Sequence, residues 1–285
     1  SYGSDTDWMA TYSVPDYRVK VSTFAGSGDP LSEDGSGIEA SFKGPQVITS
    51  DTNGNIYIAG YPSHKIRKID SSGNVSTIAG TGSPGSTNGN SSSATFKYPT
   101  GAASDSLGNV YVADYDNHLI RKIDSSGQVS TFAGGEAGFS DGQGTSAKFN
   151  YPIGIVVDFD GNVFVGDTRN HRVRKITPDG NVTTFAGSGS QGSQDGSATT
   201  ASFYRPRGLA IDNNGNIYVA DSWNHMIRKI DSTGNVTTLA GNGTSGYQDA
   251  QGSSALFYSP NDVAVDNHGN VYVADEKNNR VRKID

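Results

Sequence analysis

The segment NHMIRKID, at residues 224–231, recurs at nearly constant intervals along the 285-residue chain. Close copies begin at residues 63, 117, 170 and 278, and the arginines in the five copies stand 54, 53, 54 and 54 residues apart. A second segment, VTTLAG at residues 236–241, keeps the same step, as does a proline that recurs at Pro45, Pro99, Pro152, Pro206 and Pro260. A fixed period of this length indicates a repeat architecture.

Each period contains four short runs that are rich in β-branched and aromatic residues, for example GLAID, NIYVA, MIRKI and VTTLA within residues 208–240. The connectors DNNGN (212–216) and DSTGN (231–235) place glycine where a short hairpin needs a left-handed residue. The second and third runs are apolar on both faces, so each sheet needs a neighbour on both sides. Radial stacking of four-stranded antiparallel sheets meets that need, and we therefore predict an all-β propeller.

The two ends of the chain predict the number of blades. The last repeat stops after three strands, whereas a first copy of the outer-strand motif, VSTFAG at residues 21–26, precedes any complete repeat. We therefore predict a five-bladed propeller over residues 21–285, closed by the N-terminal strand, which completes the C-terminal blade. Residues 1–20 are predicted to form an N-terminal extension that packs on the propeller exterior.

The repeated patterns NxYVADxxNHxIRKI and AGxGxxGxxDGxGxxAxFxxPxG resemble those of NHL-repeat β-propellers, in the long-repeat form found in secreted and cell-surface proteins. The resemblance covers residues 21–285. Most propellers of this family have six blades, so a count of five is a departure from the family pattern.

Composition narrows the class of partner. The net charge of -7 argues against nucleic acid, because neutralising phosphates requires a basic face. The sequence has no run of 18 consecutive apolar residues, so we predict no membrane insertion. From the Ser-, Thr-, Asn- and Gly-rich, cysteine-free sequence we expect a location outside the cytoplasm, in an extracellular or periplasmic space. We also expect a monomer.

The repeated histidines are interpreted as structural. A shared metal needs nitrogens at about 2.0–2.1 Å, whereas equivalent points on neighbouring blades lie on the order of 10 Å apart. We therefore expect each histidine to bond its own or a neighbouring turn, with Asn279 doing the same at the fifth place. The four histidines are His64, His118, His171 and His225.

Three other repeated sets are also interpreted as structural. The aspartates Asp114, Asp167, Asp221 and Asp275 are expected to accept backbone N–H bonds at the turn that follows them. Five Arg-Lys pairs, which begin at Arg67, Arg121, Arg174, Arg228 and Arg282, are expected to form a mixed, solvated rim. The loop residues Phe42, Phe96, Phe149, Phe203 and Phe257 are expected to fill the layer between blades.

A ligand site is expected where the repeats differ, on the top face that carries the inter-blade loops and the turns between second and third strands. Aromatic, cationic and amide groups collect there, and this mixture suits a protein, peptide or carbohydrate partner. The candidate ligand-binding residues are Gln46, Tyr61, Tyr98, Tyr115, Tyr151, Arg169, Arg205, Arg207, Trp223, Asn261, Asp262 and Lys277.

The competing interpretation is a metal-assisted lyase or hydrolase with Ca²⁺ or Zn²⁺ at the mouth of the axis. The mouth offers Gln46, Asn261 and Asp262, of which one is a carboxylate, whereas hard cations take several oxygen ligands. We therefore predict no catalytic residues, metal ligands or cofactor, and keep a calcium ion at the axial mouth as the alternative.

Overall fold

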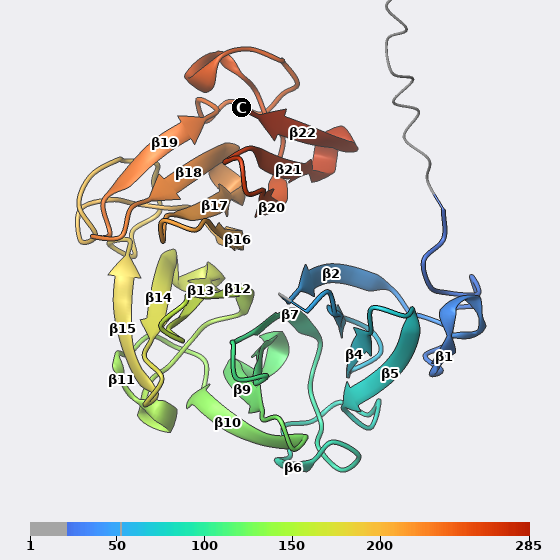
Figure 1. Cartoon of the computed structure of the whole chain (residues 1–285). Coiled ribbons are helices and arrows are strands. Elements are labelled where there is room, and N and C mark those ends of the chain that lie inside the picture. Colours follow the sequence, from blue (N-terminus) through green and yellow to red (C-terminus); the bar gives the residue numbers. More distant parts are fainter. Residues whose placement is uncertain (1–21, 52) are drawn as a thin grey trace, which may run out of the picture.

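The computed structural model describes residues 22–51 and 53–285, and its strands form five antiparallel sheets around a central axis (Figure 1). Each sheet is one blade, numbered 1 to 5 in chain order, so the predicted all-β, five-bladed propeller is confirmed. The predicted extension at residues 1–20 lies outside the described residues. No helix in the described part of the chain is long and apolar enough to cross a membrane.

The two strands nearest the axis form a hairpin in every blade. The innermost strands are β2 (Pro45–Ser50), β7 (Pro99–Ser104), β12 (Pro152–Val157), β16 (Pro206–Ile211) and β20 (Pro260–Val265). The second strands are β3 (Ile56–Gly60), β8 (Val110–Asp114), β13 (Val163–Asp167), β17 (Ile217–Asp221) and β21 (Val271–Asp275).

The third and outer strands follow in the same order. The third strands are β4 (Lys65–Ile69), β9 (Leu119–Ile123), β14 (Arg172–Ile176), β18 (Met226–Ile230) and β22 (Arg280–Ile284). The outer strands are β5 (Asn74–Ala79), β10 (Gln128–Gly134), β15 (Asn181–Ala186) and β19 (Val236–Ala240), and short edge strands β1 (Gly35–Ser36), β6 (Gly89–Asn90) and β11 (Gly142–Gln143) pair with the first three of them.

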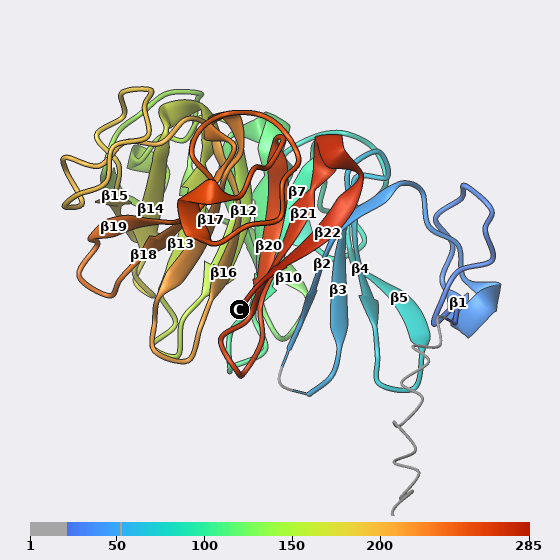
Figure 2. The ribbon, with the colours of Figure 1, turned by 90° about the horizontal axis from the view of Figure 1, so that it is seen from above.

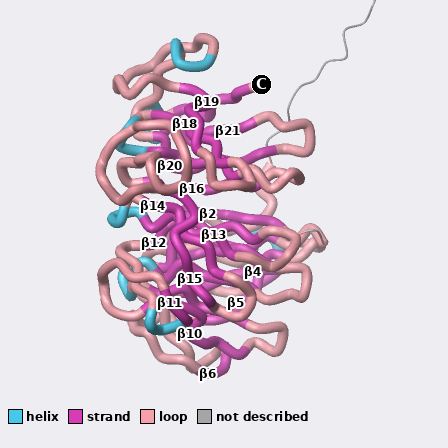
Figure 3. Tube along the Cα trace, turned by 90° about the vertical axis from the view of Figure 1, so that its left-hand side faces the viewer, coloured by secondary structure: helices cyan, strands magenta, loops and turns pink. Residues whose placement is uncertain are grey.

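Short helical turns complete the described elements, and most of them gather toward one side of the strands (Figure 3). Four of them follow a second strand directly and therefore lie on the top face, while the hairpin turns between first and second strands lie at the opposite end (Figure 2). The seven turns are η1 (Gly37–Glu39), η2 (Tyr115–Asn117), η3 (Gly144–Ser146), η4 (Thr168–Asn170), η5 (Ser222–Asn224), η6 (Gly252–Ser254) and η7 (Glu276–Asn278).

The hairpin turns form as the connector sequences predict. In the turn between β16 and β17, the carboxylate of Asp212 accepts the backbone N–H groups of Asn214 and Asn216, both at 2.9 Å. Gly215 has a φ of +78°, the left-handed conformation that glycine adopts at little cost. The repeated Asp-x-x-Gly-Asn connectors therefore fix the register of each hairpin locally.

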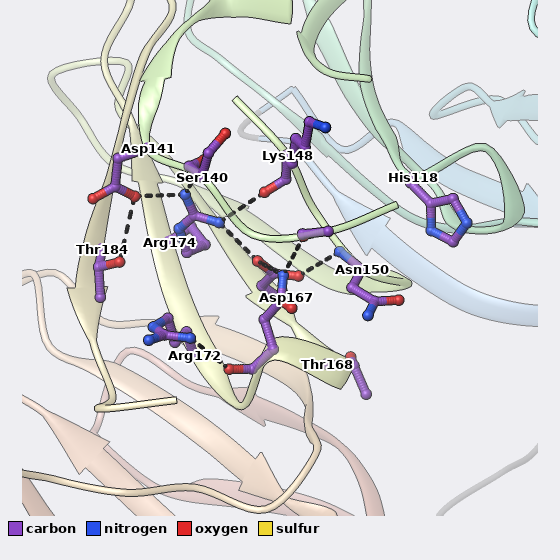
Figure 4. A network of polar contacts seen from close by, with 12 residues as sticks. His118, Ser140, Asp141, Lys148, Asn150, Asp167, Thr168, Arg172, Arg174 and Thr184 are labelled. Carbon is purple, nitrogen blue, oxygen red and sulfur yellow. Dashed lines mark hydrogen bonds and ion pairs between the residues drawn. The ribbon is translucent and has the colours of Figure 1, made fainter. Parts of the chain in front are cut away.

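The repeated arginines are buried, so the predicted solvated rim is wrong for them. In blade 3, Arg174 is 0% exposed and lies between Asp167 and Asp141, at 2.8 and 2.6 Å (Figure 4). Its guanidinium also donates to the carbonyl oxygen of Lys148 at 3.1 Å and lies 5.1 Å from the centre of the Phe149 ring. Successive residues of a strand point to opposite faces, so the arginine enters the layer between blades while the next lysine stays half-exposed.

The repeated aspartates and phenylalanines belong to the same buried layer. The other carboxylate oxygen of Asp167 accepts the N–H of Asn150 at 2.8 Å, in the preceding loop rather than in the turn that was predicted. Four of the five phenylalanines fill the layer as predicted, because Phe96, Phe149 and Phe203 are 0% exposed and Phe257 is 1% exposed, whereas Phe42 is only partly buried. Each arginine therefore anchors the loop that leads into its own blade.

The predicted closure of the ring is not confirmed. Residues 22–26 form no strand, and the N–H groups of Gly26 and Ser27 donate to the carbonyls of Gly37 and Ala40 in the loop of blade 1. Within the described residues β22 pairs with β21 alone, so blade 5 has three strands. Figure 1 shows blades 1 and 5 at the two ends of an open arc.

Two residues that act between neighbouring blades are replaced at this open seam. Gly154 comes so close to β16 that a Cβ atom there would lie 2.3 Å from the carbonyl oxygen of Arg207, yet the same place in β20 holds the larger Asp262. Asn279 stands where the other blades have a histidine, and within the described residues its amide makes no bond to blade 1. The seam therefore lacks the histidine link that the four closed seams share, whereas the glycine is common to only three of them, because Val47 takes its place in blade 1.

Candidate functional site at the mouth of the axial channel

The five innermost strands enclose an axial channel with a cavity volume of about 550 Å³. Small and aliphatic residues such as Ala102, Ile155 and Leu209 line its wall, while Thr100, Asn261 and Asp262 bring polar groups to the end where the inner strands begin. We call this end, together with the loops and helical turns around it, the mouth. It lies on the predicted top face.

The recurring histidines link neighbouring blades at the mouth. Nδ1 of His118 accepts the backbone N–H of Tyr151 at 3.1 Å, and His64 makes the same bond to Tyr98. Equivalent bonds join His171 to the residue at position 205 and His225 to the residue at 259, at 3.1 and 3.0 Å. Burial lowers the pKa of all four rings, which favours the neutral form that can accept at Nδ1. The structural interpretation of these histidines is confirmed.

These bonds hold the residue before four of the five repeated prolines in a left-handed conformation. The φ angles of Tyr98, Tyr151, Arg205 and Ser259 lie between +50° and +55°, a region that residues other than glycine rarely adopt. At three of these places a large side chain is therefore fixed at the mouth by the neighbouring blade.

The four predicted tyrosines form a continuous row, which we call the tyrosine row. Tyr61 lies 4.8 Å from Tyr98 and 6.4 Å from Tyr115, and Tyr115 lies 4.7 Å from Tyr151, measured between ring centres. The guanidinium of Arg169 covers the far end, 3.9 Å from the centre of the Tyr151 ring. The row crosses the mouth from blade 1 to blade 3, and its rings are half-buried.

Charged and aromatic groups occupy the mouth on blades 4 and 5. Arg205 stacks on Trp223 at 4.0 Å, and Trp223 is 42% exposed. Arg207 donates to the Oδ1 atom of Asn261 at 2.8 Å and lies 3.4 Å from a carboxylate oxygen of Glu276. The mouth therefore holds two stacked or bridged arginines beside the tyrosine row.

Burial raises the pKa of Tyr115, and the positive charges of Arg169 and Arg207 oppose that rise.

Three predicted site residues remain to be placed. Lys277 is exposed and pairs with its neighbour Glu276 at 3.0 Å. The side chain of Gln46 lies outside what the structure describes. Asp262 accepts the N–H of Val263 at 2.9 Å, and burial raises the pKa of its carboxyl group to about 6.

The described residues contain no group of three or more histidine, aspartate or glutamate side chains placed to hold a metal ion. Two contributors to the mouth, Tyr204 and Glu276, were not predicted. Tyr204 lies 5.2 Å from Trp223, and Glu276 bridges Arg207 and Lys277. Glu276 could have been found, because it occupies the variable place after the repeated aspartate that also holds Tyr61 and Tyr115.

Comparisons with known proteins identify the repeats. The model of the NHL repeat matches residues 96–123, 149–176 and 257–284, and the model of the teneurin NHL domain matches residues 186–251. The chain belongs to the NHL-repeat β-propeller family. This confirms the resemblance drawn from the recurring segments.

Several relatives of this NHL propeller are longer proteins. It is 30% identical over 252 residues to Protein SUPPRESSOR OF QUENCHING 1, chloroplastic, of Arabidopsis thaliana. The alignment covers 81% of this chain and 24% of that protein. It is 40% identical over 85 residues to a probable peptidyl-alpha-hydroxyglycine alpha-amidating lyase of Caenorhabditis elegans, over 29% of this chain and 23% of that protein. The matched part of this chain thus spans about a quarter of each of these two relatives.

Solved structures share the fold. The crystal structure of an auxiliary nutrient binding protein from Bacteroides ovatus superposes with a TM-score of 0.61 and 20% sequence identity, over 93% of this chain and 76% of that chain. At this identity the likeness concerns the arrangement of the strands alone.

Proposed function

We propose that this NHL propeller is a non-catalytic binding or scaffolding module that recognises a protein, peptide or carbohydrate partner through its mouth. The observation that carries the proposal is the tyrosine row, whose ring centres lie 4.7 to 6.4 Å apart. Tyrosine presents an apolar ring and a polar hydroxyl at low entropic cost, which suits recognition surfaces. The cysteine-free, Ser- and Asn-rich sequence supports a location outside the cytoplasm.

The arrangement of the mouth favours an elongated ligand. The tyrosine row crosses three blades, so it offers a path for a sugar chain or an extended peptide rather than a single small pocket. Arg205 and Arg207 supply hydrogen-bond donors on the other side of the mouth. A ligand with a flat apolar face and with carboxylate, carbonyl or hydroxyl oxygens along one edge would match both features.

The proposal is tested by screening the purified protein against arrays of peptides and oligosaccharides, and then measuring the affinity of each hit for variants. Tyr115→Ala, or Trp223→Ala combined with Arg207→Ala, should weaken binding about tenfold or more, because aromatic and arginine anchors dominate such interfaces. Tyr247→Ala is the matched control, since Tyr247 is 47% exposed on a loop of blade 5 and stacks on Arg280 away from the tyrosine row. Unchanged affinity in the mouth variants would place the site elsewhere.

A metal-assisted lyase or hydrolase is the second candidate function. Asp262 supports it, because this carboxyl group sits in the axial channel with a pKa raised by burial to about 6. The amidating lyase named above supplies the relative for this class. Elemental analysis of the purified protein separates the two candidates: stoichiometric calcium or zinc that disappears in Asp262→Ala would favour the enzyme.

A further inference from the structure

Three arginines from blades 3 and 4 gather at one side of the mouth, and we call them the arginine cluster. They are Arg169 of η4, Arg205 in the loop before β16, and Arg207 of β16. The hydroxyl of Thr168 donates to the carbonyl oxygen of Pro206 at 2.8 Å, and this bond joins the two blades. Arg169 follows Thr168 directly, while Arg205 and Arg207 flank Pro206. The three side chains therefore start from one shared backbone contact, which is buried because Thr168 is 5% exposed.

Two of these guanidinium groups lie against aromatic rings and keep their N–H donors free. Arg169 lies 3.9 Å from the centre of the Tyr151 ring, and Arg205 lies 4.0 Å from that of Trp223. Within the described residues, neither guanidinium makes a hydrogen bond or an ion pair, so stacking is what holds them. A stacked guanidinium presents its donors along its edge, in a fork that matches the two oxygens of a carboxylate. The cluster thus offers oriented donors for an anion.

Arg207 already has a carboxylate nearby, but the contact is loose. Its guanidinium donates to the Oδ1 atom of Asn261 at 2.8 Å and lies 3.4 Å from a carboxylate oxygen of Glu276. The second distance exceeds the value of about 2.7–2.9 Å that is usual for a charge-assisted hydrogen bond. The side chains of Arg207 and Glu276 are also 29% and 40% exposed. An incoming anion can therefore replace Glu276 at this arginine.

The cluster gives the mouth a surplus of positive charge in an acidic protein. The chain carries a net charge of -7, whereas two lysines at the mouth are neutralised by neighbours. Lys97 pairs with Asp116 and Lys277 with Glu276, each at 3.0 Å. The surplus lies at the end of the tyrosine row, because Arg169 covers its last ring. A negatively charged ligand would be attracted to the mouth and repelled by the acidic surface elsewhere.

The turns around the mouth offer aromatic faces and side-chain donors rather than a free backbone edge. The N–H of Arg169 donates to the carbonyl oxygen of Asn150 at 3.0 Å, and that of Asp116 to the carbonyl oxygen of Lys97 at 3.1 Å. A peptide that binds by strand addition needs an unpaired edge. A sugar ring needs an aromatic face for its C–H groups and planar donors for its oxygens. These features favour a carbohydrate over an extended peptide.

We propose that the mouth binds an acidic oligosaccharide, with a uronic acid carboxylate on the arginine cluster and sugar rings along the tyrosine row. The inference rests on the proposed function, since it names the ligand class of the same site. Arg169 and Arg205 supply free donors for the carboxylate, and Arg207 exchanges its loose contact with Glu276 for a closer one. The tyrosine row distinguishes this site from one for a small inorganic anion, which needs no apolar surface.

The probe is an end-labelled oligogalacturonate, titrated with the full chain in the presence of a chelator and followed by fluorescence anisotropy. Its control is the same oligosaccharide with methyl-esterified carboxylates, which keeps the sugar rings and removes the charge. We expect saturable binding of the acid and at least about tenfold weaker binding of the ester, because hydrogen bonds to a charged group are the stronger ones. Added salt should weaken the binding of the acid.

Four variants of the protein locate the carboxylate. Arg169→Gln and Arg205→Gln should each weaken binding of the acid about tenfold, since each removes a charged donor. Arg280→Gln is the matched control, because Arg280 also stacks on an aromatic ring, that of Tyr247 at 3.9 Å, but outside the mouth. Glu276→Gln should bind the acid about twofold to fivefold more tightly, since it removes a competing carboxylate.

The proposal fails if the acid does not bind, if the ester binds equally well, or if both arginine variants bind the acid undiminished. Equal or tighter binding of polyglutamate or of single-stranded DNA, lost in the same variants, would assign the cluster to a peptide or a nucleic acid instead. A ligand from the arrays that is lost in Tyr115→Ala but kept by both arginine variants would overturn the acidic class and leave the proposed function standing. If no ligand is affected by Tyr115→Ala, the proposed function fails as well.

Discussion

Arg169 and Arg174 stand five residues apart in blade 3, but Arg169 is exposed and Arg174 is buried. Arg174 belongs to the repeat, is 0% exposed and is held by two carboxylates. Arg169 belongs to no repeat, is exposed, and stacks on Tyr151 at the mouth. The repeated positions therefore build the scaffold between blades, and the positions that vary from blade to blade are available for recognition.

Exchange of each arginine for alanine gives the largest expected contrast. Arg174→Ala leaves Asp167 as an unpaired buried charge, which costs about 3–5 kcal/mol of unfolding free energy. Arg169→Ala removes an exposed stacking contact and should change the stability by no more than about 0.5 kcal/mol. Urea denaturation followed by tryptophan fluorescence measures both, and equal losses in the two variants would refute the division between scaffold and mouth.

A second contrast concerns the two aspartates that face different surroundings, Asp262 in the channel and Asp266 in an exposed turn. Burial raises the pKa of Asp262 to about 6, while hydrogen bonds led by that from Asn270 lower the pKa of Asp266 to about 2. The native state thus holds the Asp262 proton more tightly than the unfolded chain, so this group lowers stability as pH rises from about 4 through 6.

Asp262→Asn should remove this decline, and be more stable than the wild type at pH 7 but not at pH 3. Asp266→Asn should do the reverse, because the native state favours its ionised form and that contribution is lost as pH falls below about 4. Melting temperatures of the three proteins across this pH range provide the measurement. Parallel profiles for wild type and Asp262→Asn would show that Asp262 titrates as if it were exposed.

Apart from the Arg169→Ala control, the smallest effect is expected at the histidine links. His118→Ala should cost about 1 kcal/mol by removing the acceptor for the Tyr151 N–H. His268→Ala is the control, since His268 lies in an exposed hairpin turn. Differential scanning calorimetry resolves this change; full stability in His118→Ala would show that the bond contributes nothing, and His118→Asn, which copies Asn279, tests whether an amide can replace the ring.

The period, the hairpin turns and the structural role of the repeated histidines could be predicted, because they depend on local chemistry that recurs within the chain. Gly215 needs its left-handed turn wherever the sheet lies in space. The burial of Arg174 was missed because arginine is usually solvated, and the carboxylate that holds it, Asp141, comes from a loop 33 residues away. A repeated aspartate seven residues before every buried arginine except Arg67 was the available signal.

The mouth and the seam show where prediction from the sequence stops. The candidate list contains all four members of the tyrosine row, but not their order, since the contact of Tyr61 with Tyr98 joins two blades whose spacing no local pattern encodes. The predicted closure of the ring is not confirmed, for the same reason. VSTFAG at residues 21–26 has the sequence of an outer strand, yet whether it reaches β22 depends on the angle summed over all the blades.

The four histidine links have one further consequence. Each depends on an unprotonated Nδ1 atom, so all four respond to the same variable, the concentration of protons. Acid would protonate all four rings and remove these four bonds together. The contacts between neighbouring blades would then weaken at every closed seam at the same pH, rather than at one seam after another.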